Sequence, residues 1–164
     1  EDLAGNPVAL ALQEQGETYA LDVRGLGESL PDEDLDFWHP YGMDYMIHGY
    51  CHMLGESYAG RRVFDVLRTV DLLASLGARE ILLTGRGQGA LLALYTALLD
   101  ERITHATLVN GPASYAEWVA TPLVEWPAAN VVTGALAFYD LPDVVRALGA
   151  RVTVQEPWGP RMHT

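Results

Sequence analysis

A short apolar run that passes through alternate glycines into a second apolar run is the feature that most constrains the fold of this chain. Residues 81–90 read ILLTGRGQGA. The turn itself consists of Gly85, Arg86, Gly87, Gln88 and Gly89. The run before the turn suits a short buried parallel strand, and residues 90–99 are apolar almost all round, as in a buried helix. Glycines are needed where a strained turn leaves no room between a strand and the following helix. The segment therefore predicts a strand, a tight turn and a helix.

Weaker helix and strand patterns alternate along the rest of the chain. The expected strands are 18–23, 80–84, 106–109 and 151–155. The expected helices lie between Asn6 and Gly16, from 63 to 74, from 90 to 99 and from 141 to 148. Residues 31–50 and 113–133 look irregular. Strands separated by helices predict an α/β fold with an open, mostly parallel sheet and helices on both faces. The most apolar strand, 80–84, is expected at the centre.

Composition excludes several classes of function. The formal net charge of −12 argues against a nucleic-acid surface, which needs clustered Lys and Arg. No apolar run reaches the roughly 18 residues of a membrane span. The single cysteine, Cys51, excludes an internal disulfide. The partners that remain are small molecules and other protein domains.

The strand–turn–helix context of 81–90 resembles the α/β-hydrolase superfamily. Residues 22–29, which read DVRGLGES, are similar to a turn found in its acetyl xylan esterase and prolyl oligopeptidase-like branches, and the YDLPD of 139–143 resembles the same group. The resemblance covers about residues 18 to 156 and implies that 85–89 is the nucleophile elbow. It further implies that the backbone N–H of Gln88 faces an oxyanion and that Glu156, near the end of the last strand, is a candidate for the acid position.

The centre of the elbow departs from the family pattern. Family members carry serine where this chain has Gly87, and glycine has no side chain to attack an acyl carbon. His163 follows Glu156 by only seven residues, too few for the helix and strand that precede the family's histidine. The earlier strand and loop that supply half of the oxyanion hole are also missing. We therefore expect one domain over 1–164, incomplete at both ends and non-catalytic.

The resemblance also implies what such a domain would do. A relative of carboxylic-ester or peptide hydrolases without a nucleophile would bind a small ester or a carbohydrate, or support another domain of the same polypeptide. No cofactor and no metal are expected, and a secreted or periplasmic location would be compatible with the family. Two other interpretations of the glycines stay open: a nucleotide-binding turn and an unrelated α/β turn. A P-loop is excluded because neither Lys-Ser nor Lys-Thr follows the glycines.

A second segment resembles the elbow. Residues 55–60 read GESYAG, the elbow sequence of serine carboxypeptidases, which makes Ser57 the alternative nucleophile of an active hydrolase. The residues before it, 46–54, contain two histidines and a glycine and make a poor buried strand. The helix after it is amphipathic rather than buried. Ser57 is therefore expected to cap that helix.

Two groups of side chains have a minor functional interpretation. On a helix, His48, Cys51 and His52 would lie near one face, as metal ligands could, but no second group of ligands accompanies them. Three aromatic residues could line a sugar-binding rim but are expected to pack in the core or in a lid: Trp38, Tyr41 and Tyr45.

Overall fold

The computed structural model describes residues 12–13, 16–30 and 42–163, which belong to two compact units, 1–34 and 35–164. In the first unit, 18–23 have no regular secondary structure, so the strand predicted there is wrong. A strand requires a neighbouring chain that completes its hydrogen-bond ladder, which an apolar pattern alone cannot supply. The helix η1 (Gly27–Ser29) follows. Most of the helix expected between Asn6 and Gly16 lies outside the described residues.

The second unit contains a parallel sheet of three strands. These are β1 (Ile81–Arg86), β2 (Ile103–Val109) and β3 (Val152–Gln155), in the order β1-β2-β3. The register places Gly85 beside Leu108 and Leu108 beside Val154. The α/β class with an open parallel sheet is therefore confirmed, together with three of the four predicted strands.

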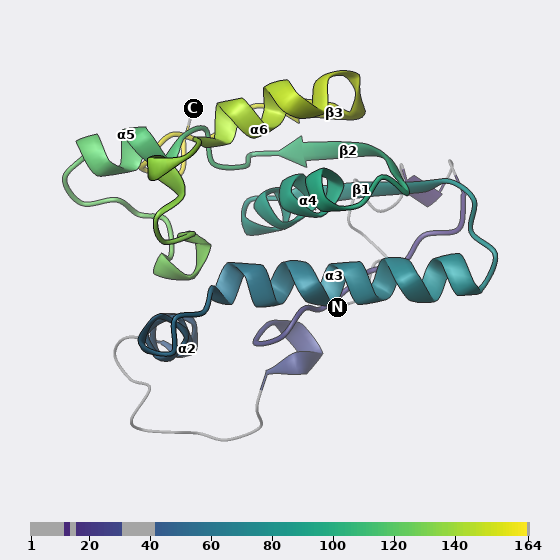
Figure 1. Ribbon diagram of the computed structural model, residues 1–164, viewed down its shortest axis with the longest axis horizontal. Helices are drawn as coiled ribbons and strands as arrows, with labels where there is room; N and C mark the ends of the chain where they lie inside the picture. Colours follow the sequence, from purple (N-terminus) through teal and green to yellow (C-terminus); the bar gives the residue numbers. More distant parts are fainter. Residues whose placement is uncertain (1–11, 14–15, 31–41, 164) are drawn as a thin grey trace. The chain divides into compact units, whose positions relative to one another are not determined.

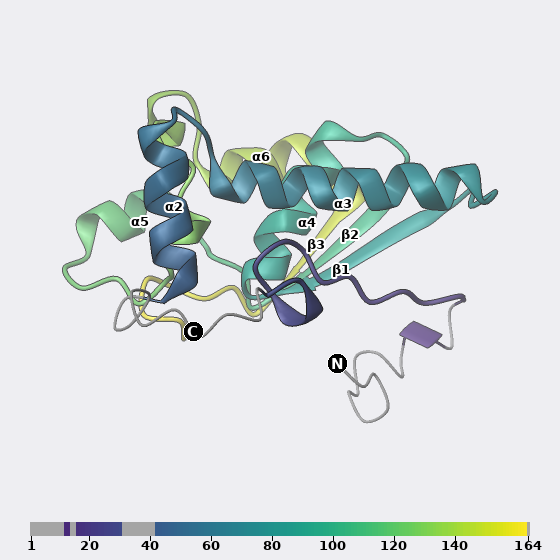
Figure 2. The ribbon, with the colours of Figure 1, turned by 90° about the horizontal axis from the view of Figure 1, so that it is seen from below.

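Three helices pack beside this sheet. They are α3 (Tyr58–Ser75), α4 (Gln88–Leu99) and α6 (Leu141–Leu148), the last continued by η5 (Gly149–Arg151). Figures 1 and 2 show all three on the same side of the strands. The expectation of helices on both faces is not met within the described residues of 35–164. A right-handed crossover places each connecting helix on the same face of the sheet as long as every new strand is added at the same edge. A helix lies on the other face only where the strand order reverses.

The position of β1 also differs from expectation. In the described sheet β2 is central and β1 is an edge strand. Leu82 of β1 is 48% exposed, whereas Ile103 of β2 is fully buried. The apolar side chains of 80–84 are explained by the contacts of β1 with α4 on one face of the sheet, and not by neighbouring strands on both sides of β1.

The core centres on α4. Every residue from Ala90 to Ala97 is buried, as its apolar composition predicts. The helix packs against β1, β2, α3 and α6, so its whole circumference contacts protein. None of the described helices is long and apolar enough to cross a membrane.

Two regions expected to be irregular contain helices. Residues 43–53 form α2 (Met43–Met53), and residues 115–120 form α5 (Tyr115–Ala120), which precedes the short helices η3 (Ala128–Asn130) and η4 (Ala135–Ala137). Helix α2 is held by distant residues: Cys51 packs against Tyr58 and Ala129, and Asp44 pairs with Arg62. Such contacts between separate elements override a weak local pattern.

Candidate functional site

Gly87 forms the apex of the turn between β1 and α4. Its backbone angles are φ 57° and ψ −118°, and it is the N-cap residue of α4. Its N–H donates to the carbonyl of Val109, 2.9 Å away, which ties the apex to the end of β2. Gly87 therefore has a positive φ at the carboxyl end of the strand, in a turn where the sequence predicts that glycine is needed. Glycine adopts this conformation at little cost, whereas other residues are strained in it.

The flanking glycines allow the strand and the helix to touch. A Cβ atom on Gly85 would lie 2.1 Å from the carbonyl oxygen of Gly89 and 2.6 Å from the nitrogen of Ala90. At Gly87 the situation is the opposite, because a Cβ atom there would meet nothing within 4 Å in the described part of the chain. The turn is crowded at its base and open at its apex. A side chain would fit at the apex, although this sequence does not provide one.

The first turn of α4 carries the donors of the site. The first N–H groups of a helix have no intrahelical partner and attract negative charge, so the backbone of Gln88 and Gly89 suits an oxygen acceptor. The side chain of Gln88 donates from Nε2 to Oδ1 of Asn130. Asn130 is only 1% exposed, and its Nδ2 has no hydrogen-bond partner among the described residues. The sequence did not single out Asn130, since it lies in an irregular segment 42 residues after Gln88.

A chain of buried hydroxyl groups continues from Asn130. Tyr115 donates to the backbone oxygen of Asn130 at 2.8 Å, Tyr95 donates to Tyr115 at 3.5 Å, and Tyr139 donates to Tyr95 at 3.2 Å. Burial raises the pKa of Tyr95 and of Tyr115 well above the ordinary tyrosine value. Both phenols therefore stay protonated near neutral pH, and they serve as hydrogen-bond donors rather than as bases.

Asn110 joins the carboxyl ends of the three strands. Its Oδ1 accepts from Nε of Arg86 at 3.1 Å, and its Nδ2 donates to the backbone oxygen of Glu156 at 3.0 Å. Asn110 and Glu156 both have positive φ, 52° and 46°. The guanidinium of Arg86 lies 6.0 Å from the ring centre of Trp158. The structure thus brings Arg86 and Glu156 to one edge through Asn110, which directly follows β2 and which the sequence did not single out.

Glu156 and His163, the residues considered for the acid and histidine positions, accept hydrogen bonds through their backbone oxygens. Glu156 directly follows β3, as predicted, but its side chain is exposed. His163 is exposed too, and its carbonyl accepts from the N–H of Gly159 at 3.0 Å in the C-terminal turn.

Ser57 occupies a helix start, as predicted. It is the N-cap residue of α3, with φ −104° and ψ 120°, and its Oγ accepts from the N–H of Gly60 at 3.1 Å. The segment before it is the end of α2 and a turn, not a strand. The sequence likeness of GESYAG to an elbow is therefore not matched by elbow geometry.

The possible metal ligands lie on α2 without forming a cluster. Among the residues that the structure describes, no group of three His, Cys, Asp or Glu side chains is arranged to hold a metal ion. Burial and the nearby His52 lower the pKa of His48, and Cys51 is buried. Of the three aromatic residues expected to pack in the core or in a lid, Tyr45 is 54% exposed and so is not a core residue, while Trp38 and Tyr41 lie outside the described residues.

No protein-family model, no curated protein and no solved structure matches the chain. Its function has to be inferred from the geometry around Gly87 and from the residues that surround it.

Proposed function

We propose that this chain is an α/β-hydrolase-like domain that has lost its nucleophile and binds ligands instead of hydrolysing them. The observation that carries the proposal is the conformation of Gly87, which combines positive φ, a place between a parallel strand and a buried helix, and open space at the apex. A simple strand-to-helix turn does not require this strained geometry, whereas a nucleophile elbow does.

The chemistry around the apex supports binding rather than acyl transfer. Gly87 offers no nucleophilic atom, and burial raises the pKa of Tyr95 and Tyr115 above a value at which a phenol is already protonated near neutral pH, so neither serves as a base. The first turn of α4 offers backbone N–H groups that can donate to an oxygen atom of a ligand, and the buried amide of Asn130 lies beside them. An uncharged ester carbonyl or a carbohydrate hydroxyl provides the matching acceptor. A neighbouring domain of the same polypeptide could present equivalent backbone carbonyls.

A serine-reactive fluorophosphonate separates this proposal from the active-hydrolase alternative. We expect no labelling of the unmodified chain and no turnover of an activated aryl acetate above the uncatalysed rate. Labelling that disappears in Ser57→Ala would overturn the proposal and make Ser57 the nucleophile. Labelling that persists in Ser57→Ala would also overturn it, and would place the reactive serine elsewhere.

A ligand titration tests the binding half of the proposal. The backbone amide resonances of Gln88 and Gly89 should shift on addition of an acetylated xylo-oligosaccharide, and less with its deacetylated counterpart. ATP should leave both resonances unchanged. Shifts with ATP alone would favour the nucleotide-binding turn, and shifts with none of the three would contradict a small-molecule site at the elbow.

A further inference from the structure

Asn130 has one hydrogen-bonding group to spare beside the first turn of α4. Its backbone N–H donates to the carbonyl of Pro127 at 3.0 Å, and its backbone oxygen accepts from the hydroxyl of Tyr115 at 2.8 Å. Its Oδ1 accepts from Nε2 of Gln88. Nδ2 alone has no partner among the described residues, although Asn130 is only 1% exposed. Because buried donors nearly always have an acceptor, this one indicates a place for an acceptor oxygen.

The amide of Asn130 lies next to the open apex of the turn. Nδ2 and Oδ1 are bonded to the same carbon atom, so both lie beside the side chain of Gln88. Gln88 is half-buried and directly follows Gly87, where an added Cβ atom would meet nothing within 4 Å in the described part of the chain. The spare donor of Asn130 and the free N–H groups of the first turn of α4 therefore belong to one site.

The neighbours of Asn130 fix which of its two amide atoms is spare. Its backbone is held by Tyr115, which is 4% exposed and accepts from Tyr95 at 3.5 Å. Its side chain is held by Gln88 through Oδ1. Turning the amide over would bring the NH₂ groups of Gln88 and Asn130 against each other and lose their hydrogen bond. The group left for a ligand is therefore the donor.

A site that offers donors distinguishes two kinds of oxygen. The backbone groups at the start of a helix are N–H groups, and Oδ1 of Asn130 is engaged by Gln88. The carbonyl oxygen of an ester only accepts, so it leaves no group unpaired there. A hydroxyl group also donates, and its proton would lose water without gaining an acceptor. We propose that the amide nitrogen of Asn130 selects an ester carbonyl over a free hydroxyl group, a role that rests on the binding function proposed above.

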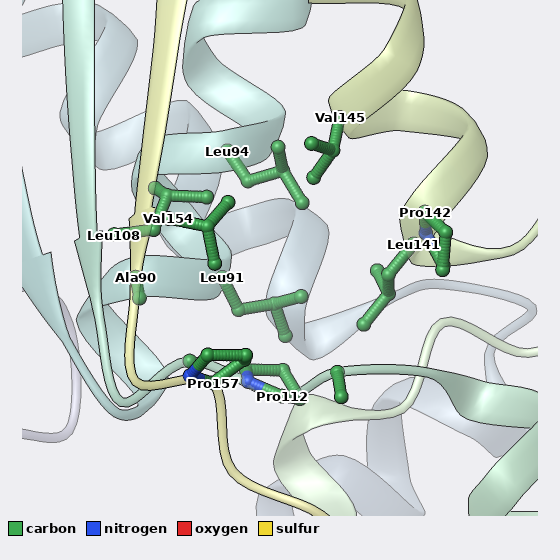
Figure 3. A pocket seen from close by; sticks show the side chains of 12 residues that line it. Ala90, Leu91, Leu94, Leu108, Pro112, Leu141, Pro142, Val145, Val154 and Pro157 are labelled. Carbon is green, nitrogen blue, oxygen red and sulfur yellow. The ribbon is translucent and has the colours of Figure 1, made fainter.

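The apolar side of α4 cannot supply this selectivity. Figure 3 shows the side chains that lie between α4 and α6, among them Leu91, Leu94 and Val145. None of the side chains that line this depression donates or accepts a hydrogen bond. Two sugars that differ only in one acetyl group would find no polar partner there. The choice between them therefore depends on the first turn of α4 and on Asn130.

The side-chain NH₂ resonances of Asn130 test the contact directly. We expect an acetylated xylo-oligosaccharide to shift them together with the backbone amides of Gln88 and Gly89, with one dissociation constant for all. The deacetylated counterpart should bind at least about tenfold more weakly. Shifts of the backbone amides without a shift at Asn130 would leave the elbow as a binding site and overturn the role of Asn130. The absence of all these shifts would contradict both proposals.

Gln88→Glu reverses the polarity of the amide pair. A carboxylate only accepts, so it would take Nδ2 of Asn130 and leave Oδ1 for the ligand. We expect the ratio of the affinities for the acetylated and the deacetylated sugar to fall at least about tenfold. Gln155→Glu is the matched control, since it makes the same change at the exposed end of β3 and should leave the ratio unchanged.

Asn130→Asp makes the complementary change at the buried position. It keeps the shape of the side chain but replaces the donor with an acceptor, so the same ratio should fall by a similar factor. A purely structural role of Asn130 would lower stability in this variant and leave the ratio unchanged. If Asn130→Asp does not fold, Gln88→Glu decides, because its position is half-buried. An unchanged ratio in folded Gln88→Glu would overturn the proposal.

Discussion

The segments 85–89 and 55–60 have similar sequences, but different interactions stabilise them in the structure. At 85–89 the backbone of a strand meets the backbone of a helix, so closely that a Cβ on Gly85 would overlap Gly89. At 55–60 a turn follows α2, and a Cβ on Gly55 would meet nothing within 4 Å in the described part of the chain. A glycine pattern alone therefore does not distinguish a strand-to-helix turn from a helix-to-helix turn; the preceding element decides.

The second segment is organised by side chains instead. Ser57 caps α3 through Gly60, and the fully buried Arg62 joins α3 to α2 by pairing with both carboxylate oxygens of Asp44, at 3.0 and 2.6 Å. The guanidinium also lies 4.3 Å from the ring centre of Tyr58. At 85–89, where two backbones touch, there is no space for an added atom. At 55–60, where side chains make the contacts, removal of one partner breaks them. The two segments should therefore respond to opposite kinds of mutation.

The largest effect is expected for Gly85→Ala. The added methyl group would lie 2.1 Å from a backbone oxygen that cannot move without displacing α4. We expect a loss of at least about 4 kcal/mol in the free energy of unfolding, or no folded protein. Urea denaturation followed by circular dichroism measures this. Gly55→Ala is the control and should cost only about 1–2 kcal/mol, because its φ of 72° is strained but the space is free. Similar losses in the two variants would refute the contrast.

Asp44→Ala should have the next largest effect. It removes the carboxylate that pairs with the buried guanidinium of Arg62, and we expect a loss of about 2–3 kcal/mol, reduced from the value for a fully buried pair because Asp44 is partly exposed. Glu56→Ala removes the exposed partner of Arg61 and should cost less than about 1 kcal/mol. The denaturation midpoints of the two variants measure these losses. Equal losses would mean that burial of Arg62 does not strengthen its ion pair with Asp44.

Gly87→Ser tests the apex of the turn at 85–89. The side chain fits, but the backbone angles are unfavourable for serine, so the variant should fold and lose about 1–2 kcal/mol. Gly134→Ser is the control, because Gly134 lies in the ordinary left-handed region with open space around it and should cost less. Gly87→Ser should also remain inactive toward an activated aryl acetate. Turnover that a fluorophosphonate abolishes would show that a general base is already in place.

The smallest effect is expected for Ser57→Ala. Loss of the hydrogen bond to Gly60 should reduce stability by about 1 kcal/mol, and Ser57→Asp should restore most of it, because aspartate is an equally good N-cap residue. Thermal unfolding of the three proteins provides the comparison. An unchanged midpoint in Ser57→Ala would show that the cap contributes nothing to α3.

Local sequence patterns were sufficient to predict structure where that structure depends on residues close together in the chain. The glycines at 85, 87 and 89, the apolar residues of α4, and Ser57 as a helix cap all lie where the sequence predicts them. Each depends on backbone sterics or on hydrogen bonds within a few residues. Such effects are encoded in neighbouring residues and can be read from the chain in order.

Tertiary structure decided everything that depends on partners far apart in the sequence. The strand expected at 18–23 has no ladder, β2 rather than β1 is central, and the region before 50 contains α2 because Arg62 and Tyr58 hold it. The site residues Asn110 and Asn130 could not be found from the sequence, since each acquires its role by contacting strand ends or helix starts more than 20 residues away. The sequence alone determined the turn at Gly87 and the identity of its neighbours. Which side chains surround that turn follows only from how the separate elements pack.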